Sequence, residues 1–130
     1  MQPQDYHIYC TVTNDLSFDQ RMHRICGSLA RAGYKVTLVG RTTANSLPLD
    51  HQPFEQVRLN VSPEKGKRFY WAYNKALYRF LQTKAQAHQQ PGAANMAICA
   101  IDLDSIVPCL LVSKKYRLPR LYDAHELFTE

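Results

Sequence analysis

Acidic, amide and histidine side chains follow three apolar stretches of this chain, at the points where strands would end. They are Asn14 and Asp15 after the first stretch, Asp102 and Asp104 after the second, and Asp123, His125 and Glu126 after the third. Side chains of these types bind hydroxyl groups, transfer protons or hold metal ions. From its chemistry alone, His125 is a metal ligand, a general base, a hydrogen-bonding anchor or a purely structural residue.

The sequence argues against binding of a metal or a cofactor. The acidic residues around His125 lack a second histidine at ligand spacing, so we predict no bound metal. The loop after the first apolar stretch lacks the G-x-G-x-x-G pattern, and its nearest glycine, Gly27, falls inside a predicted helix. The sequence also lacks the G-x-x-x-x-G-K-[ST] pattern. We therefore expect neither a dinucleotide nor another cofactor.

Alternating strand and helix patterns place these residues. Mostly uncharged stretches predict buried strands, the alternating stretch 54–61 predicts a strand at the edge of the sheet, and apolar residues at helical spacing predict helices between them. The predicted strands are 6–13, 34–40, 54–61, 96–102 and 118–124, and the predicted helices are 20–33, 68–88 and 104–117. This order predicts an α/β fold, a Rossmann-like parallel sheet in strand order 3-2-1-4-5 with helices on both faces. Such sheets bind ligands beyond the carboxyl ends of their strands, so the three polar groups should share one rim.

Two arginines near the start of the first predicted helix have two possible roles. Cations at a helix N-terminus oppose the helix dipole. Either Arg21 or Arg24 faces the rim and binds an anion such as a phosphate, or both lie on a solvated face beside Asp15 or Asp19. Both arginines are therefore candidate ligand-binding residues.

Composition and charge narrow the class of protein. The chain has 130 residues, enough for one domain, and a formal net charge of +5, which favours anionic partners. Its basic residues are spread along the sequence without a nucleic-acid-binding pattern, so we expect no nucleic-acid partner. The four cysteines form no C-x-x-C pair, which fits buried thiols in a reducing compartment. Neither a secretory signal nor a spanning apolar run is visible, which predicts a cytoplasmic location.

The predicted helix 68–88 carries large aromatic residues on both sides. Its sheet-facing side is predicted to contain Phe69, Tyr73, Ala76, Leu77 and Phe80. Trp71 and Tyr78 are predicted to lie together on the other side. The cations beside them are Lys67, Arg68, Lys75 and Arg79. One interpretation is peripheral contact with an anionic bilayer at the inner membrane face. The alternatives are ordinary exposed aromatics or contact with a further domain.

Two segments also resemble a known family. The segment DQRMHRICGSLARAGYKVTLVGR (19–41) has an arginine after an aspartate and ends in an L-x-x-x-G-Y-x-V pattern. The segment DLDSIVPCLLVSKKYRLPRLYDAHELFTE (102–130) has an aspartate at a strand end, a helix beginning near a proline and a YD-x-HE motif. Together they resemble the N-terminal domain of retaining glycosyltransferases of family four, which have the GT-B architecture. The resemblance runs from Asp15 onward and is weak over 41–95.

This resemblance implies the acceptor-binding half of an enzyme that moves a sugar from a nucleotide-sugar donor to a glycan or lipid-linked acceptor with retention. It implies His125 and Glu126 as catalytic residues. The substrate-binding residues that it implies are Asn14, Asp15, Arg21, Arg24, Asp102, Asp104 and Asp123. The family binds its donor in a C-terminal domain that has no counterpart here, so we expect residues 1–130 to be a single truncated N-terminal domain, inactive alone.

One feature of the sequence departs from that family. The Gly-Gly that often follows the first strand is replaced by TNDLSFD (13–19), which argues against direct contact between this loop's backbone and a donor phosphate. The alternative hypothesis is a non-catalytic Rossmann-like binding or interaction module.

Overall fold

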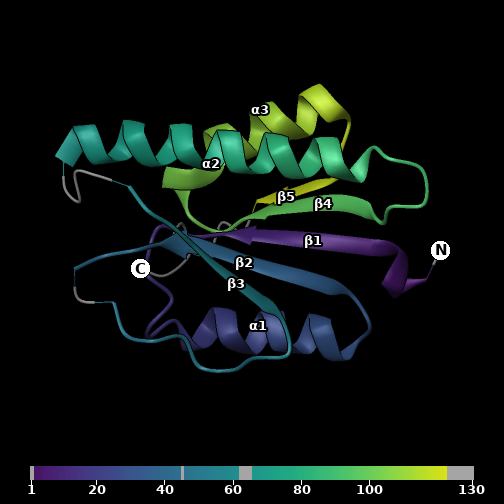
Figure 1. Ribbon diagram of the computed structural model, residues 1–130, viewed down its shortest axis with the longest axis horizontal. Helices are drawn as coiled ribbons and strands as arrows, with labels where there is room; N and C mark the ends of the chain where they lie inside the picture. Colours follow the sequence, from purple (N-terminus) through teal and green to yellow (C-terminus); the bar gives the residue numbers. More distant parts are fainter. Residues whose placement is uncertain (1, 45, 62–65, 123–130) are drawn as a thin grey trace.

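The chain forms the predicted succession of strands and helices in the computed structural model, which describes residues 2–44, 46–61 and 66–122 (Figure 1). The strands are β1 (Tyr6–Thr11), β2 (Lys35–Arg41), β3 (Glu55–Leu59), β4 (Asn95–Ala100) and β5 (Arg120–Tyr122). The helices are α1 (Gln20–Arg31), α2 (Gly66–His88) and α3 (Ile106–Tyr116), with short 3-10 turns η1 (Pro3–Asp5) and η2 (Leu103–Ser105).

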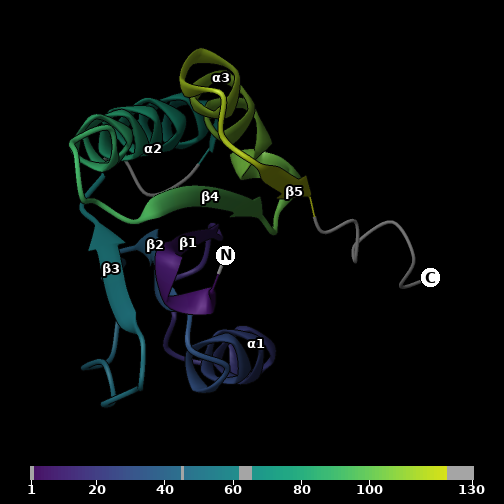
Figure 2. The same cartoon turned by 90° about the vertical axis from the view of Figure 1, so that its right-hand side faces the viewer.

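The described strands form one parallel sheet in the order β3-β2-β1-β4-β5. This confirms the predicted α/β, Rossmann-like fold and its strand order. Helices α2 and α3 lie on one face of the sheet, and α1 lies on the other (Figure 2). The direction of winding reverses between β1 and β4, so the carboxyl ends of these two strands mark the switch point where such sheets bind ligands.

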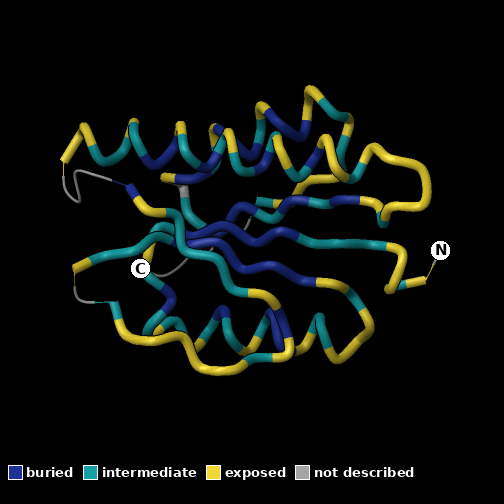
Figure 3. The backbone as a smooth tube through the Cα atoms, in the orientation of Figure 1, coloured by how far each residue is buried: buried dark blue, intermediate teal, exposed yellow. Residues whose placement is uncertain are grey.

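Alternate residues of the strands enter two separate apolar cores. Tyr9 of β1 packs under α2 with Tyr73 and Leu77, whereas its neighbour Cys10 packs under α1 with Met22. This division follows from the two-residue period of a strand. The central strands are accordingly buried along most of their length, while the loops and outer helix faces are exposed (Figure 3).

Helix α1 is capped by Asp19 and ends shortly before Gly33. The Asp19 carboxylate accepts a hydrogen bond of 3.1 Å from the backbone N–H of Met22. The helix stops at Arg31, two residues earlier than predicted, and Gly33 turns the chain with φ of +107°. A positive φ is the conformation that glycine tolerates best after a helix.

The structure corrects one assignment on α2. Tyr73 and Leu77 are fully buried on the sheet side as predicted, and Trp71 is 70% exposed on the outer side. Tyr78 follows Trp71 by two helical turns, but the prediction that it lies on the outer side is wrong in its exposure: Tyr78 is half-buried and packs against the core under α2. The physical reason is that α3 packs beside α2 and widens the buried arc of the helix.

Candidate functional site

The loop after β1 (the β1 loop, residues 12–19) lies directly over the end of β2. The backbone N–H of Arg41 donates to the carbonyl oxygen of Asn14 at 2.9 Å. A Cβ atom added at Gly40 would stand 2.4 Å from the same oxygen, so only glycine fits beneath the loop. Leu16 has φ of +68° and its side chain is buried, with its backbone N–H bound to the Asn14 side chain at 2.8 Å. The β1 loop is therefore held in one conformation by both backbone and side chain.

Asp102 joins this loop to the end of β4. Its carboxylate accepts from the backbone N–H of Thr13 at 2.7 Å and from the Thr13 hydroxyl at 2.8 Å. Ser105 precedes α3 but makes no side-chain cap; its buried hydroxyl instead bonds to the Asp102 carbonyl at 3.1 Å and to the Thr11 hydroxyl at 3.0 Å. The predicted meeting of the first and second polar groups at one rim is thus confirmed for Asp102 and the β1 loop.

Asp15 is the centre of a second set of hydrogen bonds. Its carboxylate accepts from the backbone N–H of Ser17 at 3.1 Å, from the Ser46 hydroxyl at 3.0 Å and from the Thr43 hydroxyl at 3.2 Å. Burial acts to raise the pKa of Asp15, but the bonds from Ser17, Ser46 and Thr43 outweigh it and lower the pKa below its usual value. Asp15 is therefore a carboxylate at neutral pH, and it ties the β1 loop to the loop after β2.

Two arginines from the neighbouring strands support the same loop from below. The Nε of Arg41 donates to the Thr13 carbonyl at 3.0 Å, and its guanidinium lies 4.1 Å from the centre of the Phe69 ring. The Nε of Arg58 donates to the Asp15 carbonyl at 2.6 Å. The Tyr73 hydroxyl of α2 donates to the Val12 carbonyl. These bonds satisfy backbone oxygens that would otherwise lack a hydrogen-bond partner, and they fix the loop in place before a ligand binds.

A cavity of about 390 Å³ opens on the outer side of the β1 loop and is lined by Asn14, Asp15, Phe18 and Asp19. The Asn14 amide donates to the Asp19 carboxylate at 2.7 Å, which fixes the orientation of both groups. Phe18 is 78% exposed, the largest exposure among the big apolar side chains in the described residues. An apolar ring beside carboxylate and amide oxygens can hold a ligand that has both a CH face and hydroxyl groups.

The remaining predicted residues lie at different distances from this cavity. Asp104 is exposed in η2 beyond Asp102. Arg21 lies half-buried in the first turn of α1, close to Met22, and Arg24 is exposed one turn later. Neither arginine takes part in the hydrogen bonds described for Asp15, so their role as anion ligands stays a prediction. Asp123, His125 and Glu126 lie outside the described residues.

The sequence interpretation missed several contributors to the site. Phe18 carried a signal, because a phenylalanine within a polar loop is unusual. The others are Arg41, Thr43, Ser46 and Arg58, whose contacts with the β1 loop join residues 28 to 43 positions apart. Such contacts depend on how β2 and β3 align beside β1, which local patterns do not specify.

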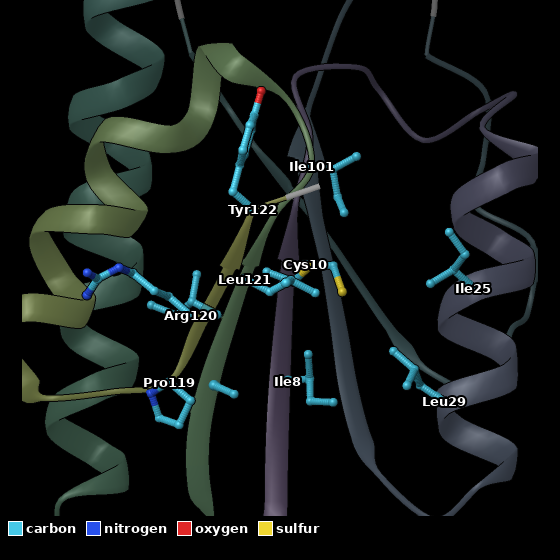
Figure 4. A pocket seen from close by; sticks show the side chains of 12 residues that line it. Ile8, Cys10, Ile25, Leu29, Ile101, Pro119, Arg120, Leu121 and Tyr122 are labelled. Atoms are coloured by element: carbon cyan, nitrogen blue, oxygen red, sulfur yellow. The ribbon is translucent and has the colours of Figure 1, made fainter. Parts of the chain in front are cut away.

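A larger, apolar groove lies on the α1 side of the sheet, away from the polar cavity. Its volume is about 710 Å³, and it runs between α1 and the faces of β1, β4 and β5. Ile25 and Leu29 of α1 face Ile8 and Cys10 of β1 across it (Figure 4). Leu121 of β5, 66% exposed, lines the same groove. Most of its lining is apolar, and the exceptions are Cys10, Cys99, Arg120 and Tyr122.

The described part of the chain contains no group of side chains that could hold a metal ion. Within residues 2–44, 46–61 and 66–122, no three His, Cys, Asp or Glu side chains converge to hold a metal ion. Asp102 and Asp15 are each committed to several hydrogen bonds from the surrounding loops. What this rim offers is a fixed set of carboxylate and amide oxygens beside the exposed ring of Phe18.

Comparison with known proteins supports the fold and goes no further. No protein-family model matches the chain, and no curated protein is similar to it in sequence. Two crystal structures of the C-terminal domain of the PF1911 hydrogenase from Pyrococcus furiosus are similar in structure. One is 13% identical with a TM-score of 0.59 and covers 95% of this chain and 94% of its own. The other is 12% identical with a TM-score of 0.60 and covers 94% and 93%.

At such low identities, these likenesses define the class of protein as a Rossmann-like α/β domain and do not carry an activity across. The chain is thus a member of a fold class that serves many chemistries, with its polar rim at the position where that class binds ligands. Among the helices that the structure describes, none is long and apolar enough to cross a membrane.

Proposed function

We propose that this chain is the acceptor-binding half of a retaining glycosyltransferase of the GT-B type. The observation that carries the proposal is the exposed ring of Phe18 beside the cavity formed by Asn14, Asp15 and Asp19. A sugar ring combines an apolar CH face with hydroxyl groups. Phe18 would pack against the CH face, and the fixed carboxylate and amide oxygens would accept hydrogen bonds from the hydroxyls.

The reaction needs little from this half beyond positioning. The acceptor hydroxyl oxygen forms a bond to the anomeric carbon of the donor as the bond from that carbon to the diphosphate oxygen breaks. The hydroxyl proton passes to the departing phosphate oxygen, and a nucleoside diphosphate leaves. Stabilisation of charge on that leaving group matters more here than a strong base. The donor would be bound by a second domain, as the sequence resemblance implies.

The resemblance supplies the roles of the remaining residues. His125 would orient hydroxyl groups near the reacting carbon, with Asp123 or Glu126 fixing its ring. Arg21 or Arg24 would meet a phosphate, and Asp102 would hold the β1 loop through Thr13, as its hydrogen bonds already do. Asp104 would contact the acceptor.

The test is a transfer assay on the complete natural polypeptide that contains these residues. It would be incubated with a panel of nucleotide sugars and with soluble glycan acceptors, and product stereochemistry would be followed by NMR. We expect transfer with retention. Replacement Phe18→Ala should raise KM for the acceptor about tenfold while leaving KM for the donor unchanged, since the ring contributes ~1.4 kcal/mol of binding. Phe18→Tyr, which keeps the ring, should restore the acceptor KM.

A second arm tests the catalytic assignment. His125→Ala should lower kcat by at least about tenfold, equivalent to ~1.4 kcal/mol of transition-state stabilisation, without loss of thermal stability. Transfer at normal rate in this variant would remove the role assigned to His125. Saccharide binding that is lost in Phe18→Ala, without turnover of any donor, would favour the alternative of a non-catalytic binding module. Absence of both binding and transfer would overturn the proposal.

A further inference from the structure

The outer surface of the α2–α3 layer differs in character from the rest of the molecule. On α2, residues 68, 71, 75 and 79 recur at helical spacing and form one exposed stripe opposite the core. On α3, residues 107, 111, 114 and 115 do the same. The outer α2–α3 surface comprises Arg68, Trp71, Lys75 and Arg79 of α2 and Val107, Leu111, Lys114 and Lys115 of α3.

All the charged residues of this surface are basic. Neither the 23 residues of α2 nor the 11 residues of α3 include an aspartate or a glutamate in their sequence. Five of the eight residues that form the surface are lysine or arginine, and all five are exposed. The nearest acidic residue along the chain is Asp104 of η2, which is exposed three residues before Val107 and borders the surface at the start of α3. A surface whose own charged side chains are all positive attracts an anionic partner.

The two stripes form one continuous surface. Both helices lie side by side on the same face of the sheet (Figures 1 and 2). Lys115 of α3 donates a hydrogen bond of 3.2 Å to the side chain of Gln82, which follows Arg79 by one turn of α2. Gln86 of α2 likewise donates to the Tyr116 hydroxyl at 3.3 Å. The cations of α3 therefore extend the basic stripe of α2 sideways.

Large apolar side chains are interspersed among these cations. Trp71 is 70% exposed, Leu111 51% and Val107 46%. The indole of Trp71 is held edge-on by Tyr70, with ring centres 5.4 Å apart, so it projects from a fixed base. Exposed aliphatic side chains gain nothing beside a phosphate backbone, whereas they lose contact with water on entering a lipid layer.

We propose that the outer α2–α3 surface docks on an anionic lipid bilayer. Its lysines and arginines would lie at the level of the lipid phosphates, and Trp71, Val107 and Leu111 would enter the boundary between headgroups and acyl chains. This docking is independent of glycosyl transfer, because it uses the layer of helices behind the rim and none of the residues assigned to the site. It would hold the rim cavity at a fixed orientation to the membrane.

The chain offers a direct probe of this contact, because Trp71 is its single tryptophan. The chain would be mixed with phosphatidylcholine vesicles with and without phosphatidylglycerol. With the anionic vesicles at low salt, we expect co-sedimentation, a shift of Trp71 emission to shorter wavelength and quenching by lipids brominated near the headgroup end of the acyl chain. Added salt should weaken binding, because each basic residue near the surface contributes about fivefold to the affinity.

Two charge-reversed variants distinguish an effect of this surface from an effect of the net charge of the chain. Lys75→Glu/Arg79→Glu should weaken vesicle binding by at least about twentyfold. Arg31→Glu/Lys35→Glu, at exposed positions on α1 and at the start of β2, changes the net charge equally and should have little effect. Trp71→Ala keeps the charge and should weaken binding about tenfold. Far-UV circular dichroism would confirm that each variant is folded.

Three results would overturn the proposal. One is equal loss of binding in the two charge-reversed variants. Another is binding to anionic vesicles without any change in Trp71 emission, which would mean that the apolar side chains stay in water. The third is salt-dependent binding of double-stranded DNA or RNA, measured without vesicles, with a higher affinity than the chain shows for anionic vesicles. That result would identify the surface as a nucleic-acid site.

Discussion

Asp102 shows how a single carboxylate organises the rim. It accepts two short hydrogen bonds from Thr13, one from the backbone and one from the hydroxyl. In Asp102→Ala, the Thr13 backbone N–H loses its partner in a half-buried position. We expect the free energy of unfolding to fall by about 1–3 kcal/mol, the usual cost of leaving a buried donor unsatisfied. Urea denaturation followed by circular dichroism would measure it.

Asp104 provides the matched control for this prediction. It stands two residues further on, is exposed, and carries the same charge. Asp104→Ala should change the free energy of unfolding by less than about 0.5 kcal/mol. If the two variants were equally stable, the rim would not depend on the Asp102–Thr13 bonds.

His7 occupies a second polar cluster, at the opposite end of the sheet. Its Nε2 lies 2.7 Å from the Thr37 hydroxyl, which in turn donates to Glu55 at 2.7 Å. Because the only hydrogen of that hydroxyl goes to Glu55, His7 must donate from Nε2. Its ring also stacks on Tyr9, with centres 4.3 Å apart, and faces His88 at 5.1 Å.

This cluster predicts a loss of stability in acid. Burial, and then His88, lower the pKa of His7 from 6.5 to about 4; Lys35 and Lys84 act in the same direction and Glu55 opposes them. Between these pH values the unfolded chain binds a proton that the folded chain excludes. The contribution of neutral His7 is therefore complete above about pH 6.5 and is lost as pH falls towards 4. We expect about 1–2 kcal/mol, after allowing for partial exposure to solvent.

The measurement is urea denaturation over this pH range in the wild type and in His7→Gln, which keeps a donor for Thr37 but does not titrate. The pH dependence should be smaller in His7→Gln. His51→Gln, at an exposed histidine on the loop before β3, should keep the wild-type dependence. A steep loss of stability in acid that survives in His7→Gln would assign the effect to other groups.

At the scale of elements, Gly40 of β2 sets the path of the β1 loop. A Cβ at this position would lie 2.4 Å from the Asn14 carbonyl and 2.8 Å from the Leu16 side chain. The first contact is with backbone, which cannot move aside without displacing the loop. Gly40→Ala should therefore destabilise the fold by about 1–3 kcal/mol and perturb the cavity beside Phe18. Thermal unfolding and the NMR shifts of residues 13–18 would record the two effects.

Gly27 is the control for the same substitution in a different setting. It lies inside α1, and its added Cβ would meet only the end of the flexible Arg31 side chain at 3.2 Å. Alanine favours a helix interior over glycine, so Gly27→Ala should stabilise the fold by about 0.5–1 kcal/mol. Similar destabilisation by both variants would contradict the close approach at Gly40.

The helices and strands were predictable from sequence where their structure depends on residues close together in the chain. The strands β1, β2 and β4 are largely buried on both faces, so the interior of each is an uncharged stretch that periodicity detects. Asp19 and Gly33 marked the ends of α1 through chemistry that acts within a few residues. The partial burial of Tyr78 was not predicted from the pattern of α2 alone, because α3, a different element, packs beside that helix. The bonds of Thr43 and Ser46 to Asp15 were missed for the same reason.

At the scale of the whole molecule, the two faces of the sheet are covered unequally. Helices α2 and α3 cover one face, whereas α1 alone lies on the other and leaves the apolar groove beside β4 and β5 (Figure 2). Two cysteine side chains line this groove, Cys10 and Cys99, which are aligned on neighbouring strands. Cys10 is buried, as are Cys26 and Cys109, while Cys99 is only partly buried.

This asymmetry predicts an order of thiol reactivity. Hydrogen bonds with Cys26 and Cys99, together with burial, raise the pKa of Cys10, and burial raises the pKa of Cys109 to about 12. Both thiols are therefore poor nucleophiles in the folded chain. In native 130-residue protein at mildly alkaline pH, iodoacetamide should alkylate Cys99 first. Cys10, Cys26 and Cys109 should react together and only at the rate of global unfolding, since they belong to two cores joined by one sheet.

Mass spectrometry of proteolytic peptides would follow the four sites separately, with Cys99→Ser as the control in which fast labelling disappears. Low concentrations of urea should accelerate the three slow sites equally and leave Cys99 unchanged. Early labelling of Cys10 or Cys26 without Cys109 would show that the α1 face opens independently of the α2–α3 face. Protection of Cys99 in the native chain would mean that the groove is covered in solution.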